Sequence, residues 1–287
     1  MLSYRNNLSG LRAPGYRFRF RVQAISHRAL YLPRSMRDLD AVKKLLAGAH
    51  PSSVFATHDI HEARKRFNEL RIRYDFPYWA ATRFPIRHID DPDLLTTLVL
   101  NENQHIIIDN FLKTYQNQHP GRFIITKNRP RCGVTTCVQA YIIWLQLFQT
   151  PKNSQTCGVS NFNLGRLKEN IALFFNRDSV NYGRYKFPIR DKYTSAFFNT
   201  INRPDALRGI DFGYVHLVDM AKWKDPDGIR SGRAIRAALS GILLDYRTLI
   251  VMEGNIPSPK YNPIFYNHYT YFNSVAHDPL FHPINLP

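Results

Sequence analysis

The sequence is poor in acidic residues, in cysteine and in long apolar runs. Among its 287 residues, 22 Asp and Glu stand against 39 Lys and Arg, which gives a formal charge of +17. This imbalance predicts a polyanionic partner, such as nucleic acid, an anionic surface or an acidic protein. The three cysteines have no CxxC spacing, which argues against a disulfide scaffold and favours a reducing compartment.

No segment has the apolar length of a signal-peptide core or of a membrane span. The best apolar run, 140–148, includes Gln146 and falls well short of the roughly 20 residues that cross a bilayer. The sequence therefore predicts a soluble protein with no membrane partner. Because 44% of the residues are hydrophobic and 13% aromatic, the chain can bury a core, which excludes wholesale disorder.

Composition divides the chain into three parts. We expect an arginine-rich arm over 1–45, a helical lead-in over 46–100 and an α/β domain over 101–287. Aromatic and basic residues alternate within the arm, which is typical either of an edge strand with a solvated face or of a segment that grips phosphate or an acidic partner. Candidate contacts to such a partner, there and in the basic region 176–208, are Arg12, Arg17, Arg19, Arg21, Arg184, Lys186 and Arg190.

Helical and strand patterns alternate from about residue 100 onward. The periodicity predicts helices at 104–115, 134–148, 164–175 and 229–246, and strands at 122–127, 156–160, 214–218 and 248–252. Residues 176–208 show no regular pattern. Strands that alternate with helices of this length predict an α/β fold with a mainly parallel sheet flanked by helices.

A glycine-containing loop, 128–133, connects the strand predicted at 122–127 to the helix predicted at 134–148. Gly133 would let the backbone approach phosphate oxygens, and the N–H groups and dipole of the following helix would stabilise their charge. A threonine at the helix start ligates Mg²⁺ in such loops. The usual GxxxxGK[ST] pattern has lysine where this chain has Val134, so a plain strand-to-helix turn is an open alternative.

Two features outside the loop strengthen the interpretation as a nucleotide site. Asp219 ends a mostly apolar run, an arrangement that places a carboxylate beside the phosphate loop to hold Mg²⁺. Gln104 opens the helix before the first strand, and its amide both donates and accepts, as recognition of an adenine edge requires. The order of the three features fits a single pocket.

Six segments in sequence order resemble the ATPase domain of large terminases, the DNA-packaging motors of tailed bacteriophages. They are 75–79, 100–104, 127–136, 218–221, 250–259 and 261–266. The resemblance implies a P-loop NTPase fold, ATP and Mg²⁺ as cofactors, and a location in the host cytoplasm or the virion. It also implies double-stranded DNA or acidic portal or capsid proteins as partners, and assembly as a ring homo-oligomer.

The resemblance also assigns roles to individual residues. It implies nucleotide binding by Gln104, Gly133, Val134, Thr135 and Thr136, metal binding by Thr135 and Asp219, and a catalytic role for Asp219. Lys127, Arg129 and Arg131 are candidate substitutes for the lysine and arginine of the family's phosphate loop: Lys127 and Arg131 for nucleotide binding, and Arg129 and Arg131 for catalysis.

Two departures from the family pattern count against hydrolysis. Val134 occupies the position of a phosphate-binding lysine, and Met220 replaces the acid that orients water. A third departure is that the chain ends at Pro287, where the family would begin a nuclease domain. The first hypothesis is a catalytically degenerate terminase-like protein that acts as a binding or structural component.

Two alternatives stay open. One is an active packaging ATPase with relocated residues, in which Lys127, Arg129 or Arg131 contacts phosphate and Asp225 or Asp227 orients water, beside a separate nuclease chain. The other is an unrelated basic α/β protein that binds nucleic acid.

Overall fold

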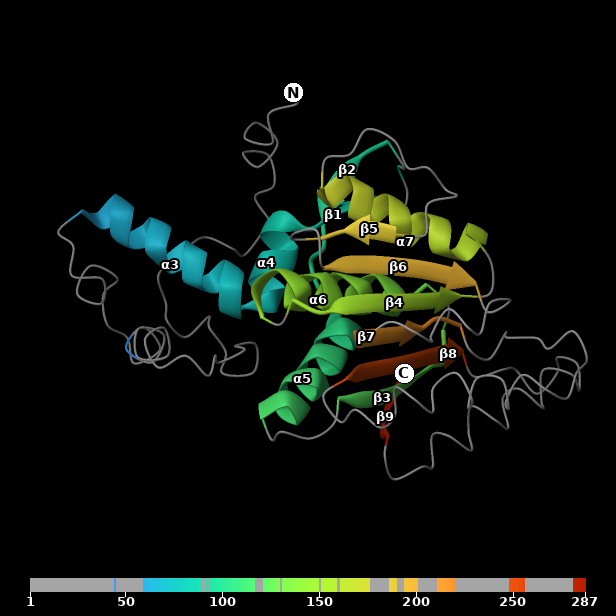
Figure 1. Ribbon diagram of the computed structural model, residues 1–287. Helices are drawn as coiled ribbons and strands as arrows, with labels where there is room; N and C mark the ends of the chain where they lie inside the picture. The colour runs from blue at the N-terminus through green and yellow to red at the C-terminus, as the bar shows by residue number, and fades with distance from the viewer. Residues whose placement is uncertain are drawn as a thin grey trace, which may run out of the picture.

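The structure, a computed structural model, describes a defined part of the chain. This part comprises residue 44 and residues 59–88, 91, 93–116, 121–129, 131–149, 151–158, 161–175, 186–189, 194–200, 211–219, 248–255 and 281–287. Figure 1 shows a sheet with helices packed against it and one helix, α3, that extends away from it.

A mainly parallel sheet of seven strands forms the centre of this part of the chain. Its order is β5-β6-β4-β7-β8-β3-β9, and only the edge pair β5–β6 is antiparallel. The strands are β3 (Arg122–Lys127), β4 (Asn153–Gly158), β5 (Lys186–Pro188), β6 (Ser195–Thr200), β7 (Phe212–Leu217), β8 (Leu249–Asn255) and β9 (His282–Leu286). The predicted α/β fold with a mainly parallel sheet is confirmed.

Helices and a short ribbon accompany the sheet. The helices are α3 (Ile60–Tyr74), α4 (Phe76–Arg83), α5 (Glu102–Gln116), α6 (Val134–Phe148) and α7 (Asn161–Phe174), and the ribbon pairs β1 (Pro85–Arg87) with β2 (Leu95–Thr97) in antiparallel fashion. Residues of α4, including Phe76 and Trp79, belong to the same buried core as those of α6. The boundaries drawn at residues 45 and 100 remain predictions.

Helix α6 covers one face of the sheet and fixes which strand residues lie beneath it. Its residues Gln139 and Gln146 accept hydrogen bonds from Thr156 and Ser154 of β4, at 3.0 and 3.4 Å between oxygens. Side chains alternate between faces along a strand, so residues in register with Thr156 share its face. The pairing of Thr156 with His216, and of His216 with Val251, places His216 and Glu253 on the α6 side.

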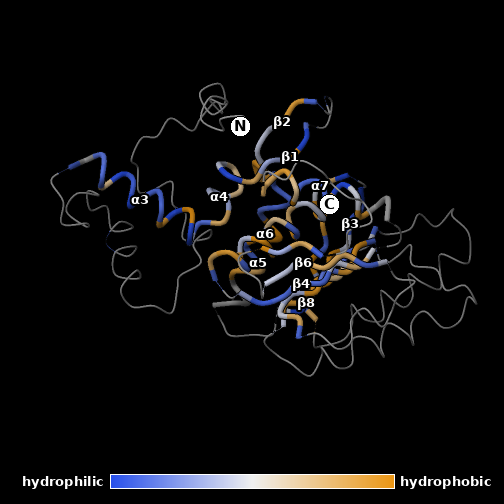
Figure 2. Tube along the Cα trace, turned by 45° about the horizontal axis from the view of Figure 1, so that its top comes forward, coloured by the Kyte–Doolittle hydropathy of each residue, from blue (hydrophilic) through white to orange (hydrophobic). Residues whose placement is uncertain are grey.

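The core between α4, α6 and the sheet is rich in aromatic rings. Phe76 packs edge-on against Tyr141 and Trp144, with ring centroids 5.1 and 5.7 Å apart. Such edge contacts match the positive rim of one ring to the negative face of another. Figure 2 shows the resulting contrast, in which apolar segments gather around α6 and the strands while α3 is mainly hydrophilic.

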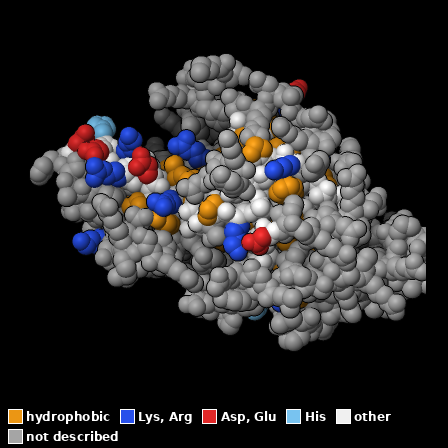
Figure 3. Space-filling view, viewed as in Figure 1, with side chains coloured by type: hydrophobic (Ala, Val, Ile, Leu, Met, Phe, Trp, Pro, Cys, Tyr) orange, Lys and Arg blue, Asp and Glu red, His pale blue; other side chains and the backbone are white. Residues whose placement is uncertain are grey.

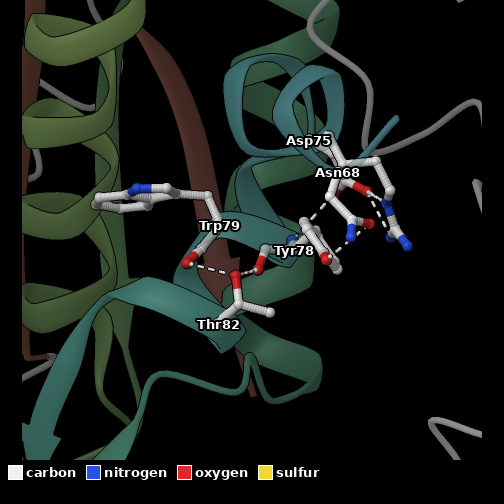
Figure 4. Close-up of polar contacts among 6 residues, drawn as sticks. Asn68, Asp75, Tyr78, Trp79 and Thr82 are labelled. Carbon is white, nitrogen blue, oxygen red and sulfur yellow. Dashed lines mark hydrogen bonds and ion pairs between the residues drawn. The ribbon is translucent and has the colours of Figure 1, made fainter. Parts of the chain in front are cut away.

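A polar cluster joins α3 to α4. Asp75 caps α4 by accepting a hydrogen bond from the Tyr78 backbone N–H at 3.1 Å, and Arg71 binds the other carboxylate oxygen while stacking 3.9 Å above the Tyr78 ring. Thr82 donates back to the Tyr78 carbonyl, as Figure 4 shows. The cluster sets the angle at which α4 enters the core, because it fixes both ends of the α3–α4 junction.

Several expectations need correction. The region 176–208, expected to be irregular, contains β5 and β6, and β4 begins at Asn153 rather than at Thr156. The short, mixed sequence of β6 carries a weak strand signal, and pairing with β4 decides its conformation.

The helix expected at 229–246 lies outside the described residues, as do Arg12, Arg17, Arg19, Arg21, Arg184 and Arg190.

Candidate functional site

The carboxyl ends of β3, β7 and β8 form one edge of the sheet, with β8 between the other two. The connection after β3 passes through α6 toward β4, whereas the connection after β8 leads to β9, on the far side of β3. Open α/β sheets bind ligands outside the carboxyl ends of their strands, at the point where neighbouring connections diverge. Loop 128–133 lies at this edge.

Gly133 allows the loop to turn directly into α6. Its φ of 75° lies in the left-handed region, and it serves as N-cap of α6 without a side-chain hydrogen bond to the first turn. A β-carbon at this position would lie 2.5 Å from Gln104 Nε2, so only glycine fits without displacement. The N–H groups that open α6 therefore have no side-chain cap from their N-cap residue, which suits an anionic ligand.

Residues at the N-terminal end of α5 hold loop 128–133 in place. Asn101 and Gln104 form a reciprocal cap, in which Gln104 N–H donates to Asn101 Oδ1 and Asn101 N–H donates to Gln104 Oε1, at 3.0 and 2.9 Å. Both amides also donate outward: Asn101 Nδ2 to the Cys132 carbonyl at 3.3 Å, and Gln104 Nε2 to the Gly133 carbonyl at 2.9 Å. The cap of one helix thus positions the entry to another.

A buried ionic cluster lies at the ends of the three strands. Lys127 Nζ is 2.8 Å from Glu253 Oε2 and 3.6 Å from Asp219 Oδ1, and Glu253 Oε1 is 3.1 Å from His216 Nε2. The side chains of Glu253 and His216 are fully buried, whereas that of Asp219 is 19% exposed. Asp219 is therefore the member of the cluster that solvent reaches most readily.

Charge pairing decides the ionisation of this cluster. Burial alone would raise the pKa of Glu253, but Lys127 and the hydrogen bond from His216 outweigh it and lower that pKa to about 2. Burial likewise opposes the charge of Lys127, and the Glu253 carboxylate overcomes it and raises the pKa of the lysine. Lys127 and Glu253 are therefore an ionised pair at neutral pH.

The structure brings some of the predicted site residues together. Gln104 contacts Gly133, and Lys127 contacts Asp219, although β7 is not the direct neighbour of β3 because β8 lies between them. Asp219 leaves β7 in a left-handed conformation, with φ of 53°.

The remaining predicted residues differ in exposure. Val134 is buried in the core, Thr135 and Thr136 are partly buried in the first turn of α6, and Arg129 and Arg131 are exposed in the loop. Lys186 lies on β5, at the opposite edge of the sheet from β9, with Nζ 5.5 Å from the centre of the Phe197 ring. It is therefore separate from the cluster at the carboxyl ends. Met220 is outside the described residues.

Sequence reasoning missed the contributions of Glu253, His216 and Asn101. A usable signal existed for the first two, because His216 lies inside the strand predicted at 214–218 and Glu253 directly follows the strand predicted at 248–252. Such a residue requires a buried partner. The partner of Glu253 lies 126 positions away along the chain, so a single sequence does not identify it.

The described residues include no group of three or more His, Cys, Asp or Glu side chains arranged to hold a metal ion. None of the helices within them has the length and apolarity to cross a membrane.

Comparison with known proteins identifies structural similarity only. No protein-family model and no curated protein matches the chain. Among solved structures, it is similar to the large terminase of a thermophilic bacteriophage in complex with ADP, with 16% identity and a TM-score of 0.37 over 59% of this chain and 40% of that one. The chain therefore spans two-fifths of that terminase.

A second similar structure is a single domain. The ATPase domain of the Thermus phage P74-26 large terminase matches with 14% identity and a TM-score of 0.38, over 61% of this chain and 78% of that one.

Proposed function

We propose that this chain binds a magnesium nucleoside triphosphate at the carboxyl ends of β3, β7 and β8, and that it hydrolyses the nucleotide slowly or not at all. In this proposal it is a binding or structural component of a phage DNA-packaging apparatus. The observation that carries the proposal is the meeting of Lys127 and Asp219, from separate strands, at the edge where Gly133 opens α6. A solvent-accessible carboxylate, a glycine turn and a helix N-terminus together suit a phosphate–Mg²⁺ ligand.

The residues at the edge fit the proposed cofactor. Asp219 offers a carboxylate oxygen and Thr135 a partly buried hydroxyl, and hard oxygen donors of this kind are what Mg²⁺ prefers. Because Mg²⁺ keeps several waters and takes its other ligands from substrate phosphates, one or two protein donors are sufficient. When bound, Mg²⁺ would neutralise charge on the phosphate oxygens.

Under this proposal, Gln104 contacts the base of the nucleotide. Its amide already holds Gly133 and Asn101, which leaves one N–H and one oxygen lone pair for a ligand.

We infer slow hydrolysis because neither position 220 nor Glu253 offers a carboxylate that could orient the attacking water. Met220 follows Asp219, and a thioether neither accepts a proton from water nor orients it. Glu253 does not replace the missing acid, because its two oxygens are bound to Lys127 and His216 and its side chain is fully buried. Loss of a water-orienting group lowers turnover by orders of magnitude in related chemistry.

The proposed partner is double-stranded DNA or an acidic portal or capsid protein, supported by the formal charge of +17. Helix α3 is not a surface of one sign, since Figure 3 shows acidic and basic side chains interspersed along it, with Glu62 paired to Arg66. The arm residues Arg12, Arg17, Arg19 and Arg21 are therefore the first choice for this contact.

Binding and turnover of ATP test the proposal directly. Isothermal titration calorimetry with Mg²⁺ and ATP should show binding that Asp219→Ala weakens and that Asp93→Ala, at an exposed site away from the edge, leaves unchanged. Phosphate release should be close to background with and without DNA. Turnover that Asp219→Ala abolishes would instead establish an active ATPase with relocated residues, and absence of binding by the unaltered protein would contradict the proposal.

A further inference from the structure

Lys127 occupies an internal position in the cluster rather than one at the ligand-facing surface. Its Nζ atom is 2.8 Å from Glu253, and the two side chains are 7% and 0% exposed. The second carboxylate, Asp219, is more distant, at 3.6 Å, and more exposed. The two contacts of Lys127 therefore differ in kind: one is an interior ion pair, and the other lies at the edge of the pocket.

His216 completes the interior pair through a hydrogen bond to Glu253. Its Nε2 atom faces the ionised Glu253 oxygen and so holds the proton that it donates. Its Nδ1 atom is buried and has no hydrogen-bond partner among the described residues. His216 therefore contacts the cluster through Nε2 alone among the described residues.

The cluster places one lysine between two carboxylates. Lys127 contacts Glu253 at 2.8 Å and Asp219 at 3.6 Å. A phosphate that withdrew Lys127 from Glu253 would leave a fully buried carboxylate without its counter-ion, which is strongly unfavourable. Asp219 can exchange its looser contact for a cation, because its oxygen lies 3.6 Å from Lys127 and its side chain is 19% exposed. The cluster therefore suits a cation better than an anion.

Arg131 is the alternative source of positive charge for phosphates. It is exposed, it lies two residues before Gly133, and its φ of 63° places a non-glycine residue in the left-handed region. Backbone strain of this kind clusters at ligand-binding positions. Arginine also forms paired hydrogen bonds to phosphate without having to leave a buried partner.

We propose that Lys127 is the internal counter-ion of Glu253, oriented through His216, and that Arg131 supplies the phosphate-binding charge that Val134 lacks. This inference rests on the proposed nucleotide site. It makes Lys127, Glu253 and His216 positioning residues, which keep the end of β3 and Asp219 in place, and it separates them from the residues that touch the ligand.

A charge-pair exchange tests this division of roles. Lys127→Met, Glu253→Gln and the double variant are compared with the unaltered protein by calorimetric titration with Mg²⁺ and ATP, and folding is checked by circular dichroism. Lys127→Met is expected to weaken ATP binding at least about tenfold, because it leaves Glu253 uncompensated. The double variant, which removes both charges together, is expected to bind within about threefold of the unaltered protein.

The role of Arg131 is tested with a matched surface control. Arg131→Gln is expected to weaken ATP binding at least about tenfold without lowering the melting temperature, whereas Arg166→Gln, an exposed site on α7, changes neither. If the double variant binds ATP as weakly as Lys127→Met does, the inference is wrong. It is also wrong if Arg131→Gln binds ATP as tightly as Arg166→Gln does.

Failure of the inference and failure of the proposed function give different results. If the unaltered protein binds no ATP, the proposed function is wrong and the role of Arg131 falls with it. If the unaltered protein binds ATP and the double variant does not, only the inference is wrong. The double variant decides the question even where Lys127→Met fails to fold, because it contains no uncompensated charge at this pair.

Discussion

The side-chain amide of Gln104 donates a hydrogen bond to the backbone carbonyl of Gly133, with 2.9 Å between nitrogen and oxygen. The oxygen of this amide accepts a hydrogen bond from the Asn101 backbone N–H. One side chain therefore closes the cap of α5 and holds the start of α6. Two segments separated by 29 positions are thereby fixed at the edge where the ligand is proposed to bind.

Removing this amide should loosen the loop. We expect Gln104→Ala to lower the free energy of unfolding by about 1–2 kcal/mol, because it deletes half of a reciprocal helix cap and leaves the Gly133 carbonyl with one hydrogen bond fewer. Urea unfolding followed by circular dichroism measures the change. Gln149→Ala, which removes an exposed bond to the Arg73 carbonyl, is the control and should have a smaller effect. Equal losses in the two variants would contradict the role assigned to Gln104.

Gly133→Ala should be destabilising for two separable reasons. A left-handed conformation is unfavourable for alanine by about 1 kcal/mol, and the new β-carbon would meet Gln104 Nε2. A double-mutant cycle with Gln104→Ala separates these two contributions. We expect Gly133→Ala to lower the free energy of unfolding less in the Gln104→Ala background than in the unaltered protein, with the backbone contribution remaining in both. Identical losses in the two backgrounds would show that the steric contact is unimportant.

Acid should destabilise the protein partly through Glu253. The pKa of this carboxyl is about 2 in the folded protein, below its ordinary value of 4.5, so its stabilising contribution is complete above about pH 4.5 and is lost as the pH falls toward 2. Linkage gives roughly 3 kcal/mol for this change. Glu253→Gln should lack this part of the acid dependence while being less stable at neutral pH.

The measurement for Glu253 is the free energy of unfolding in urea at several pH values between about 6 and about 2, a range that spans both pKa values of the carboxyl. Glu62→Gln, at an exposed carboxylate of α3, should retain the acid dependence of the unaltered protein. If Glu253→Gln and the unaltered protein lose stability in parallel, the carboxyl is not held in its ionised form by Lys127.

Asp75 should matter as a helix cap more than as a charge. Burial raises the pKa of this carboxyl despite the adjacent Arg71, so its ionised form gains little from pairing. Asp75→Asn keeps an acceptor for the Tyr78 N–H and should change the free energy of unfolding by less than about 1 kcal/mol, whereas Asp75→Ala should lower it by about 1–2 kcal/mol. Thermal and urea unfolding at neutral pH compare the two. A loss in Asp75→Asn as large as in Asp75→Ala would contradict this ranking.

Local patterns were sufficient to predict the segment from Arg122 to Phe148. A continuous apolar strand, a glycine at the turn and a long apolar helix each follow from short-range preferences, and the structure has β3 and α6 at the predicted bounds. The parallel sheet followed from the alternation of such elements.

Long-range pairing accounts for what the sequence did not reveal. Strand β6 has a short, mixed sequence and is defined by its alignment with β4, and β9 is likewise defined by β3. The ionic cluster is a relation among three strands, in which His216 and Glu253 become meaningful only once their registers are known. The pattern along one chain shows which residues share a face of a strand, but it does not show that β8 lies between β3 and β7.

The strand order has a consequence for the time at which the site can form during synthesis. Strand β3 is flanked by β8 and β9, both of which come far later in the sequence, from Leu249 onward. Until those residues leave the ribosome, β3 has two open edges, and Glu253 is not available to Lys127. The loop at Gly133 is therefore translated early but acquires its charged surroundings only after β8 has emerged, so the site proposed for the nucleotide is completed late in synthesis.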